Sequence, residues 1–300
     1  MATSTESGAG PSTALLTDRY ELTMLQAALR SGAAQRRSVF EVFARRLPAG
    51  RRYGVVAGTG RLLDALTAFR FDDAEIGWLS DNRVVDEATL DYLSSYRFTG
   101  DIDGYGEGEP FFPSSPILTV DSTFAEAVLL ETLTLSILNH DSAIASAASR
   151  MTTAAGGRPC LEMGSRRTHE QSAVAAARAA YIAGFAATSN LEAGRRYGIP
   201  TTGTSAHAFT LIHADERAAF QAQVDALGIA TTLLVDTYDV PIAVQTAVDV
   251  AGTHLGAVRI DSGDLVDLAG HVRTQLDALG ATGTRIVVTS DLDEYAIASL

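Results

Sequence analysis

The front of the chain alternates between helix-like and strand-like patterns of hydrophobic residues. Asp18 is followed three positions later by Glu21, a spacing typical of a capping box at the start of a helix. Leu22, Leu25 and Leu29 then recur at helical spacing, so a helix is predicted to open at residues 17–18. Farther along, the pattern predicts a strand at 38–43, helices at 60–69 and 86–96, a loop or short irregular strand at 101–116, and a long apolar helix from 124 to about 150.

From residue 158 onward, short apolar runs alternate with helical stretches. Short continuous apolar strands separated by helices indicate a parallel sheet covered by helices, and six strands in a row favour a barrel over an open doubly wound sheet. No G-x-G-x-x-G motif follows any of these runs, which argues against a dinucleotide-binding fold. The predicted strands lie at 159–163, 182–187, 199–202, 231–235, 256–260 and 285–288, and the helices at 173–181, 215–227, 242–250 and 265–279.

These patterns divide the chain into a tail and two domains. Residues 1–13 are rich in Ser, Thr, Gly and Ala without an apolar core, so they are predicted to form a disordered tail. Residues 14–118 are predicted to form a mixed α+β domain. Residues 119–300 are predicted to form an α/β barrel domain.

Composition narrows the classes of function. No apolar stretch approaches the roughly 20 residues that a membrane span requires, so no membrane partner is expected. No export signal is recognisable, so a cytoplasmic location is expected. The net charge of −13 argues against nucleic acid as a partner. Cys160 is the single cysteine, which excludes an intramolecular disulfide, and no histidine pair shows the spacing of a zinc site.

The chain contains no lysine, so all 23 basic residues are arginines. Schiff-base catalysis requires an amine and a Walker phosphate loop requires its lysine, so both chemistries are excluded. Arginine is well suited to hold carboxylates and phosphates through its planar guanidinium group.

Polar residues follow each predicted strand, and barrel enzymes place their chemistry on the loops at the carboxyl ends of the strands. The loops carry arginines, carboxylates and a histidine, which predicts one convergent site. Their sequences are Glu162-Met-Gly-Ser-Arg-Arg167, Thr188-Ser-Asn190, Gly203-Thr-Ser-Ala-His207, Asp236-Thr-Tyr-Asp239, Arg259-Ile-Asp-Ser-Gly-Asp264 and Ser290-Asp-Leu-Asp293.

Each candidate residue has a functional and a structural interpretation. Arg166 and Arg167 either hold an anionic substrate or form a solvated surface pair. His207 either acts as a base or phosphoryl acceptor, or bonds a neighbouring loop. Arg259 and Asp261 are two positions apart at a strand end and therefore point to one face, where they fit a carboxylate, a phosphate, ribose hydroxyls or Mg²⁺.

The remaining candidates have equally plausible structural roles. Asp264 and Asp293 are each placed to cap the following helix. Asp293 also forms a carboxylate pair with Asp291. Tyr20, on the first helix, is by default a core or interface residue.

Taken together and in order, these segments resemble the nicotinate phosphoribosyltransferase family, most closely its actinobacterial members. The resemblance runs from residue 15 to the end and combines eight segments, each weak alone. They are Leu16-Thr-Asp-Arg-Tyr-Glu-Leu-Thr-Met24, Phe40-Glu-Val-Phe43 with Arg45-Arg-Leu-Pro48, Glu162-Met-Gly-Ser-Arg-Arg167, Gly184-Phe-Ala-Ala-Thr-Ser-Asn190, Gly198-Ile-Pro-Thr-Thr-Gly-Thr-Ser-Ala-His207, Asp236-Thr-Tyr-Asp239, Arg259-Ile-Asp-Ser-Gly-Asp264 and Ser290-Asp-Leu-Asp293.

The resemblance implies a fold and a reaction. The fold is an N-terminal open-faced sandwich followed by the irregular α/β barrel of type II phosphoribosyltransferases, in a homodimer whose active sites are shared between subunits. The reaction joins nicotinate to phosphoribosyl pyrophosphate in NAD biosynthesis, with ATP hydrolysis coupled to turnover and Mg²⁺ as cofactor. The enzyme would be an ATP-coupled ligase that forms nicotinate mononucleotide and pyrophosphate.

The resemblance also implies roles for individual residues. His207 matches the histidine that is phosphorylated by ATP. Tyr20 matches a tyrosine that reaches from the partner subunit and stacks on the pyridine ring. Thr204, Arg259 and Arg166 match residues of the nicotinate pocket. Asp261 is carried over as a contact to ribose or Mg²⁺, and a Mg²⁺ site near Asp261 and Asp291 follows from that assignment.

Two departures from the family pattern leave alternatives open. Ala208 follows His207 where many relatives have serine, and the chain ends within a helical pattern that begins at Asp293. The barrel is therefore expected to be incomplete, without its last strands and the glycine-rich loop that binds the 5′-phosphate. The alternatives are a nicotinamide or quinolinate phosphoribosyltransferase and an inactive truncated remnant, while a Schiff-base aldolase barrel is excluded by the absence of lysine.

Overall fold

The computed structural model describes residues 11–300, which form two compact units. Unit 1 comprises the chain up to Ser149 together with Glu162–Ala186 and Glu192–Ile199. Unit 2 comprises Arg150–Leu161, Ala187–Leu191 and Pro200–Leu300. The predicted tail lies mostly outside the described residues, although Ser12 and Thr13 at its end donate hydrogen bonds to the carbonyl oxygens of Arg70 and Ala65.

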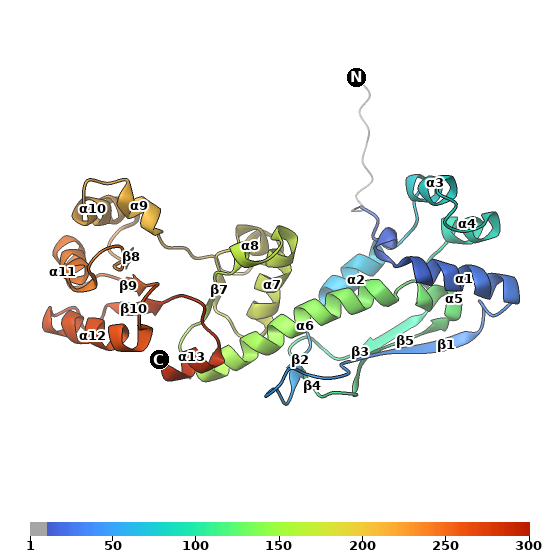
Figure 1. The fold of residues 1–300 in the computed structure, drawn as a ribbon, viewed down its shortest axis with the longest axis horizontal. Coiled ribbons are helices and arrows are strands. Elements are labelled where there is room, and N and C mark those ends of the chain that lie inside the picture. The colour runs from blue at the N-terminus through green and yellow to red at the C-terminus, as the bar shows by residue number, and fades with distance from the viewer. Residues whose placement is uncertain (1–10) are drawn as a thin grey trace, which may run out of the picture. The chain divides into compact units, whose positions relative to one another are not determined.

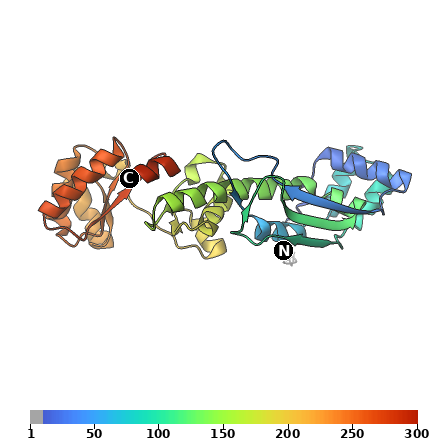
Figure 2. The ribbon, with the colours of Figure 1, turned by 90° about the horizontal axis from the view of Figure 1, so that it is seen from below.

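Unit 1 is built on an antiparallel sheet with the strand order β1-β5-β3. Side chains alternate along β1, so that Phe40 and Val42 pack against the core while Val39 and Phe43 are exposed. Figure 2 shows the strands together with the helices of this unit beside them. One face is covered and the other open, as in the predicted open-faced sandwich. The strands are β1 (Arg37–Phe43), β3 (Asp101–Gly104) and β5 (Pro116–Thr123).

Helices bury the covered face of this sheet (Figure 1). In the first helix the predicted capping box is present, because the Glu21 carboxylate accepts a hydrogen bond of 2.8 Å from the backbone N–H of Asp18. The helix ends at Gly32, whose positive φ of 77° favours glycine. The helices of this layer are α1 (Arg19–Ser31), α2 (Thr59–Thr67), α3 (Asp73–Asp81), α4 (Glu87–Ser94) and α5 (Phe124–Val128), of which the sequence pattern did not predict α3.

The single long helix predicted from residue 124 is instead two helices, α5 and α6 (Glu131–Ala154). They are separated at the fully buried Leu129 and Leu130. A new helix start leaves backbone N–H groups without intrahelical partners. The buried Glu21 accepts a 2.7 Å hydrogen bond from the N–H of Thr132 and so satisfies one of them, which explains why the chain tolerates this break.

The rest of unit 1 consists of short elements packed along α6. Ser142 and Ser146 on α6 accept hydrogen bonds from the backbone N–H groups of Ala57 and Val55, which fixes the small β2–β4 sheet. The apolar run predicted as a strand from residue 182 instead begins with the last residue of a helix. These elements are η1 (Ala14–Leu16), β2 (Gly54–Val55), β4 (Pro110–Phe111), η2 (Ser165–Arg167), α7 (Glu170–Ile182) and α8 (Leu191–Tyr197), while β6 (Leu161–Glu162) and β7 (Ala187–Thr188) lie at the borders of the two units.

Unit 2 contains a parallel sheet in the order β10-β9-β8, packed against helices as predicted. Leu233, Val258 and Ile260 are fully buried in its core. The predicted strand at 199–202 is reduced to one parallel bridge between Thr188 and Thr201. The elements are α9 (His207–Leu211), α10 (Glu216–Leu227), β8 (Thr232–Leu234), α11 (Val240–Ala251), β9 (Ala257–Ile260), α12 (Leu265–Ala278), β10 (Arg285–Val288) and α13 (Glu294–Ser299).

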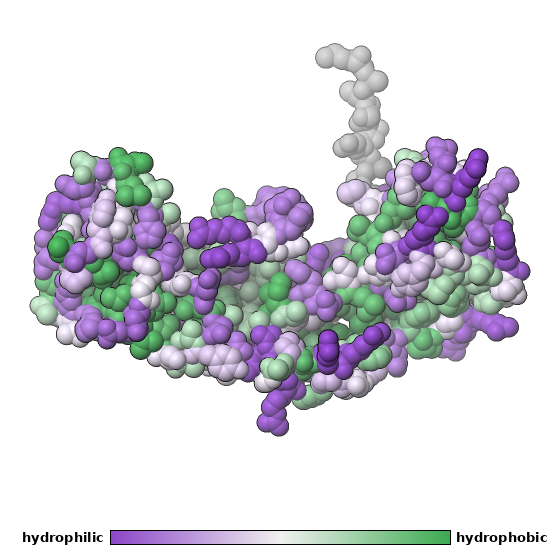
Figure 3. Space-filling model, viewed as in Figure 1, coloured by the Kyte–Doolittle hydropathy of each residue, from purple (hydrophilic) through white to green (hydrophobic). Residues whose placement is uncertain are grey.

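The surfaces of both units carry many hydrophilic side chains on the face that Figure 3 presents. Between residues 11 and 300, no helix combines the length and the hydropathy that crossing a lipid bilayer would need.

Candidate active site

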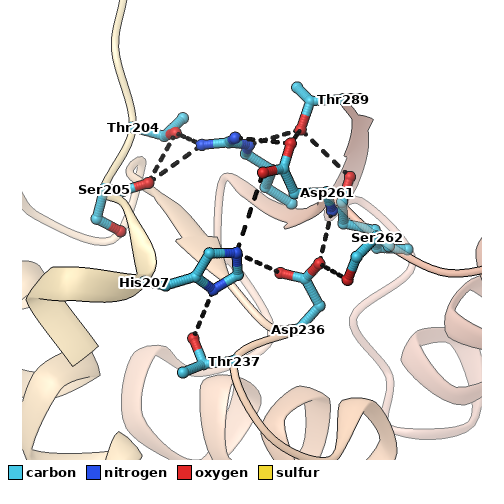
Figure 4. Close-up of polar contacts among 10 residues, drawn as sticks. Thr204, Ser205, His207, Asp236, Thr237, Asp261, Ser262 and Thr289 are labelled. Atoms are coloured by element: carbon cyan, nitrogen blue, oxygen red, sulfur yellow. Dashed lines mark hydrogen bonds and ion pairs between the residues drawn. The ribbon is translucent and has the colours of Figure 1, made fainter. Parts of the chain in front are cut away.

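The candidate site lies where the three parallel strands of unit 2 end. Asp236 and Thr237 follow β8, Asp261 and Ser262 follow β9, and Thr289 follows β10. Because neighbouring parallel strands end at the same edge of the sheet, their first loop residues lie together. Figure 4 shows these side chains facing Thr204, Ser205 and His207, which lie in and just after the loop that precedes α9.

Arg259, on the central strand, organises one half of this site. Its Nε donates to Thr289 Oγ1 at 2.8 Å, and its Nη1 donates to Thr204 Oγ1 at 2.7 Å and to the Ser205 carbonyl at 3.1 Å. Its Nη2 lies 3.0 Å from Asp261 Oδ1. Arg259 and Asp261 therefore point to the same face, as their spacing predicts, and there they form an ion pair; Thr204 belongs to the same network.

His207 occupies the other half and is the first residue of α9. Its Nδ1 lies 3.2 Å from Thr237 Oγ1 (Figure 4). Its Nε2 lies 3.9 Å from Asp236 Oδ1 and 4.0 Å from Asp261 Oδ2. The ring is thus held by one hydroxyl and faces two carboxylates.

Asp261 links the two halves. Partial burial favours its neutral form, but the hydrogen bond from Thr289 and the guanidinium of Arg259 outweigh this effect, so the pKa of Asp261 is lowered. A lowered pKa keeps this carboxylate ionised at neutral pH. Asp261 is therefore a permanent negative charge between Arg259 and His207.

Asp236 holds the loop after β9 in place. Its side chain is only 2% exposed. Its Oδ2 accepts hydrogen bonds from the backbone N–H of Asp261 at 2.9 Å and from Ser262 Oγ at 2.6 Å. Its Oδ1 is buried without a hydrogen-bond partner among the residues that the structure describes.

The other predicted site residues lie elsewhere. Tyr20 is on α1 of unit 1, 44% exposed, and its hydroxyl donates to Glu131 Oε1 at 2.8 Å. Arg166 is exposed in the short η2 helix of unit 1. Asp291 follows β10 in unit 2. Asp264 and Asp293 cap α12 and α13 through hydrogen bonds to backbone N–H groups, in accordance with their structural interpretation.

Sequence reasoning did not select Asp236, Thr237 or Thr289 as site residues. Asp236 and Thr237 were part of a quoted strand-end motif, and the position directly after an apolar strand was the available signal. Thr289 also directly follows a strand, but a lone threonine carries no distinctive pattern. Its importance arises from its hydrogen bonds to Arg259 and Asp261, which only the folded chain shows.

The carboxylates of the site do not form a ready-made metal cage. Across residues 11–300, no group of three or more His, Cys, Asp or Glu side chains has the arrangement of a metal site. Mg²⁺ in phosphate-handling enzymes is commonly held by one or two carboxylates and by substrate phosphates. Asp261 is a carboxylate at the edge of the site, and its Oδ2 lies 4.0 Å from His207 Nε2.

Comparison with known proteins shows which family this chain resembles. Residues 15–139 match the family model of the nicotinate phosphoribosyltransferase N-terminal domain. Over 294 residues the chain is 67% identical to nicotinate phosphoribosyltransferase pncB1 of Mycobacterium tuberculosis, covering 95% of this chain and 65% of that protein. It is 38% identical over 296 residues to the nicotinate phosphoribosyltransferase of Bacillus subtilis, covering 96% of this chain and 60% of the relative.

The fold gives the same result. The crystal structure of human nicotinic acid phosphoribosyltransferase matches with a TM-score of 0.81 at 29% identity, covering 94% of this chain and 69% of that one. The chain spans 65% and 60% of the lengths of the two bacterial relatives. Sequence similarity across nearly the whole chain, the N-terminal domain match and the shared fold agree with the motif resemblance, and the chain therefore belongs to the nicotinate phosphoribosyltransferase family.

Proposed function

We propose that this chain provides the pyridine-binding and phosphoryl-accepting parts of a nicotinate phosphoribosyltransferase active site. The reaction is nicotinate plus phosphoribosyl pyrophosphate, ATP and water to nicotinate mononucleotide, pyrophosphate, ADP and phosphate, in NAD salvage. The observation that carries this proposal is the position of Asp261, which lies 3.0 Å from Arg259 and 4.0 Å from His207 and so joins an anion-binding group to a nucleophile.

Arg259 and Thr204 suit an anionic pyridine substrate. Arg259 is mostly buried and already hydrogen-bonded to Thr204, so its guanidinium is fixed in orientation before a carboxylate arrives. Ribosyl transfer passes through a cation-like ribose while pyrophosphate departs. The ring nitrogen of nicotinate needs only to be aimed at the anomeric carbon, so orientation and charge stabilisation suffice without a protein nucleophile.

His207 suits the second role, acceptance of the γ-phosphoryl group of ATP. If Nε2–H faces Asp236 and Asp261, Nδ1 keeps its lone pair toward Thr237. In the transfer a bond forms from Nδ1 to the γ-phosphorus, the bond from that phosphorus to the ADP oxygen breaks, and the ring becomes cationic. The two carboxylates stabilise this charge, and water later hydrolyses the phosphohistidine to phosphate.

Mg²⁺ belongs to the proposal as a counter-charge. When bound, it neutralises diphosphate oxygens and thereby favours departure of pyrophosphate. Asp261 is the residue that would hold it, with Asp291 as a second candidate. The phosphorylated His207 would add negative charge beside that ion and help to organise it.

Tyr20 and Arg166 complete the proposal. Tyr20 presents an exposed aromatic ring whose hydroxyl is anchored to Glu131, which suits stacking on the pyridine ring across a homodimer interface with shared active sites. Arg166 is exposed, and the family resemblance implies that it is a second contact to the substrate.

The pairing of Arg259 with Thr204 favours nicotinate over nicotinamide, because a neutral amide gains little from a guanidinium. Quinolinate, with two carboxylates, would require more positive charge than Arg259 offers beside Asp261. Calorimetric titration of the chain with nicotinate and with nicotinamide should show binding of nicotinate only. Arg259→Gln should abolish that binding, while Arg285→Gln, at an exposed position on the neighbouring strand, should preserve it.

A separate experiment tests His207. His207→Ala should eliminate nicotinate-stimulated ATP hydrolysis and leave slow ribosyl transfer. Replacement of the exposed His271 on α12 serves as the control and should change neither activity. Coupling that survived in His207→Ala would refute the phosphoryl-acceptor role, and a chain that bound neither nicotinate nor phosphoribosyl pyrophosphate would favour the inactive remnant.

A further inference from the structure

The first turn of α1 is joined to the start of α6 by hydrogen bonds that the proposed mechanism does not use. The fully buried carboxylate of Glu21 accepts from the backbone N–H of Asp18 at 2.8 Å and from the N–H of Thr132 at 2.7 Å. The Thr17 hydroxyl donates to the carbonyl oxygen of Leu129 at 3.2 Å. Hydrogen bonds to a buried carboxylate are strong, so the backbones of the two helices are held together at this point.

Tyr20 and Glu131 adjoin this buried contact, and their side chains meet beside it. Tyr20 precedes Glu21 on α1, and Glu131 precedes Thr132 as the first residue of α6. Tyr20 is 44% exposed, and its phenol O–H donates to Glu131 Oε1 at 2.8 Å. Because the backbones of both residues are already held by the buried bonds, this hydrogen bond sets the direction of the phenol ring.

The electrostatics of the pair keep this hydrogen bond in place at neutral pH. The pKa of Tyr20 is raised above its usual value, first by burial, then by the hydrogen bond to Glu131 and further by the charges of Glu131 and Glu21. The Thr132 side chain acts in the opposite direction, but less strongly than the bond to Glu131. A phenol with a raised pKa stays protonated at neutral pH and therefore stays a donor to the carboxylate.

A hydrogen bond at the phenol hydroxyl restricts the whole side chain, because the hydroxyl is the atom farthest from the backbone. An exposed aromatic side chain without such a bond samples several rotamers. A ligand that stacks on it must first order it, and ordering one such side chain weakens binding by roughly threefold to tenfold. A single hydrogen bond contributes modestly to folding, so the principal effect of this one is on the orientation of the ring.

We propose that Glu131 is a positioning residue that holds the ring of Tyr20 in the orientation required for stacking on the pyridine ring of nicotinate. The inference rests on the proposed stacking role of Tyr20, and Glu131 acts only through the Tyr20 hydroxyl. An acid at the first position of a helix also interacts favourably with the helix dipole. That interaction does not involve the hydroxyl, so a substitution of Tyr20 separates the two effects.

Calorimetric titration of nicotinate into variants of the full chain tests the proposal. Glu131→Ala and Tyr20→Phe each remove the hydrogen bond and keep an aromatic ring, so each should weaken nicotinate binding by roughly threefold to tenfold. Combined in one chain, they should weaken binding no more than either alone, because they remove the same bond. Glu131→Gln keeps an oxygen that accepts from the phenol and should bind like the wild type. Asp64→Ala, which removes an exposed acid from α2, is the control and should also bind like the wild type.

A measurement without ligand tests the orientation of the ring directly. In protein with ¹³C-labelled tyrosine rings, the signal that disappears in Tyr20→Phe belongs to Tyr20, and its NMR order parameter reports how tightly the ring is held. The order parameter should fall in Glu131→Ala and keep its wild-type value in Glu131→Gln and Asp64→Ala. Urea unfolding followed by the fluorescence of Trp78, on α3 of the same unit, verifies that each variant is folded.

The outcomes separate this inference from the proposed function. The inference is wrong if Glu131→Ala leaves the order parameter of Tyr20 unchanged, or if it weakens nicotinate binding equally with and without the Tyr20 hydroxyl. Tyr20→Ala removes the ring itself and should weaken binding more than Tyr20→Phe does. Unchanged nicotinate binding in Tyr20→Ala would refute the stacking role of Tyr20, and with it the functional part of this inference.

Discussion

Replacing Glu216 with glutamine removes a buried ionisable group while nearly preserving its shape, so the effect on stability depends on pH. The pKa of Glu216 is raised from 4.5 to about 7 in the folded chain. Between these values the folded state holds a proton that the unfolded state has released. Raising the pH through this window therefore destabilises the wild type, and the penalty is absent below about pH 4.5 and complete above about pH 7.

The magnitude follows from the size of the shift. A difference of about 2.5 pKa units, at 1.36 kcal/mol for each unit, corresponds to about 3 kcal/mol. Glu216→Gln has no proton to lose and escapes this penalty. The amide brings its own cost of burial, but that cost does not change with pH. The free energy of unfolding of the variant minus that of the wild type should therefore increase by about 3 kcal/mol between pH 5 and pH 8.

The assay must follow unit 2. The single tryptophan, Trp78, lies on α3 of unit 1, so its fluorescence reports on the other unit. Far-UV circular dichroism detects the helices of both units, so the part of its urea transition that Trp78 fluorescence does not show reports on unit 2. Asp225→Asn is the control and should show a flat difference with pH. A flat difference for Glu216→Gln would show that Glu216 is ionised normally and would refute the reasoning.

Three further substitutions, each with a control substitution, have definite expected outcomes. Asp141→Asn removes the buried carboxylate that accepts from Arg61 at 2.8 Å and should lower the free energy of unfolding by about 3 kcal/mol, measured by Trp78 fluorescence. Glu192→Gln removes a carboxylate from an ion pair at the surface and should have a much smaller effect. Thr289→Val leaves Arg259 Nε without its acceptor and should weaken nicotinate binding by roughly tenfold in calorimetry, while Thr289→Ser should not. Gly256→Ala would place a Cβ 2.2 Å from the Ala230 carbonyl oxygen and should lower the free energy of unfolding of unit 2 in urea by about 1–3 kcal/mol. Gly270→Ala adds a methyl group in open space on α12 and should raise that free energy by about 0.5–1 kcal/mol.

Local signals predicted the elements whose boundaries are set locally. The capping box at Asp18 and the apolar run at 285–288 match α1 and β10, because a helix cap and a buried strand each depend on residues that are close in the sequence. Strand β5 was missed, since its polar residues Thr119 and Asp121 interrupt the apolar pattern and it is defined by pairing with β1 and β3. The break before α6 was missed for a related reason, because its new N-terminus is satisfied by Glu21 from a distant helix.

The candidate site was predictable where it depends on strand ends. His207, Arg259 and Asp261 were selected from their positions at the ends of apolar runs and Thr204 from the family resemblance, and the structure brings all four into one network. Their chemical roles and the roles of Tyr20 and Arg166 stay predictions. Glu216 gave no signal, because an acid at the first position of a helix is ordinary in sequence and becomes unusual only through burial.

The charge of the site links the buried proton to the proposed reaction. Arg259 balances Asp261, and Asp236 is a second carboxylate that faces His207. A diphosphate substrate and a phosphorylated His207 would both bring negative charge to this edge of the sheet, where each additional anion weakens substrate binding in proportion to its proximity. A proton on Glu216 removes one such anion from the interior, where solvent screens it least. The same fold with Glu216 ionised would therefore require more counter-charge from Mg²⁺ to hold the same substrate, and the Mg²⁺ concentration for half-maximal activity should rise with pH in the wild type and stay constant in Glu216→Gln.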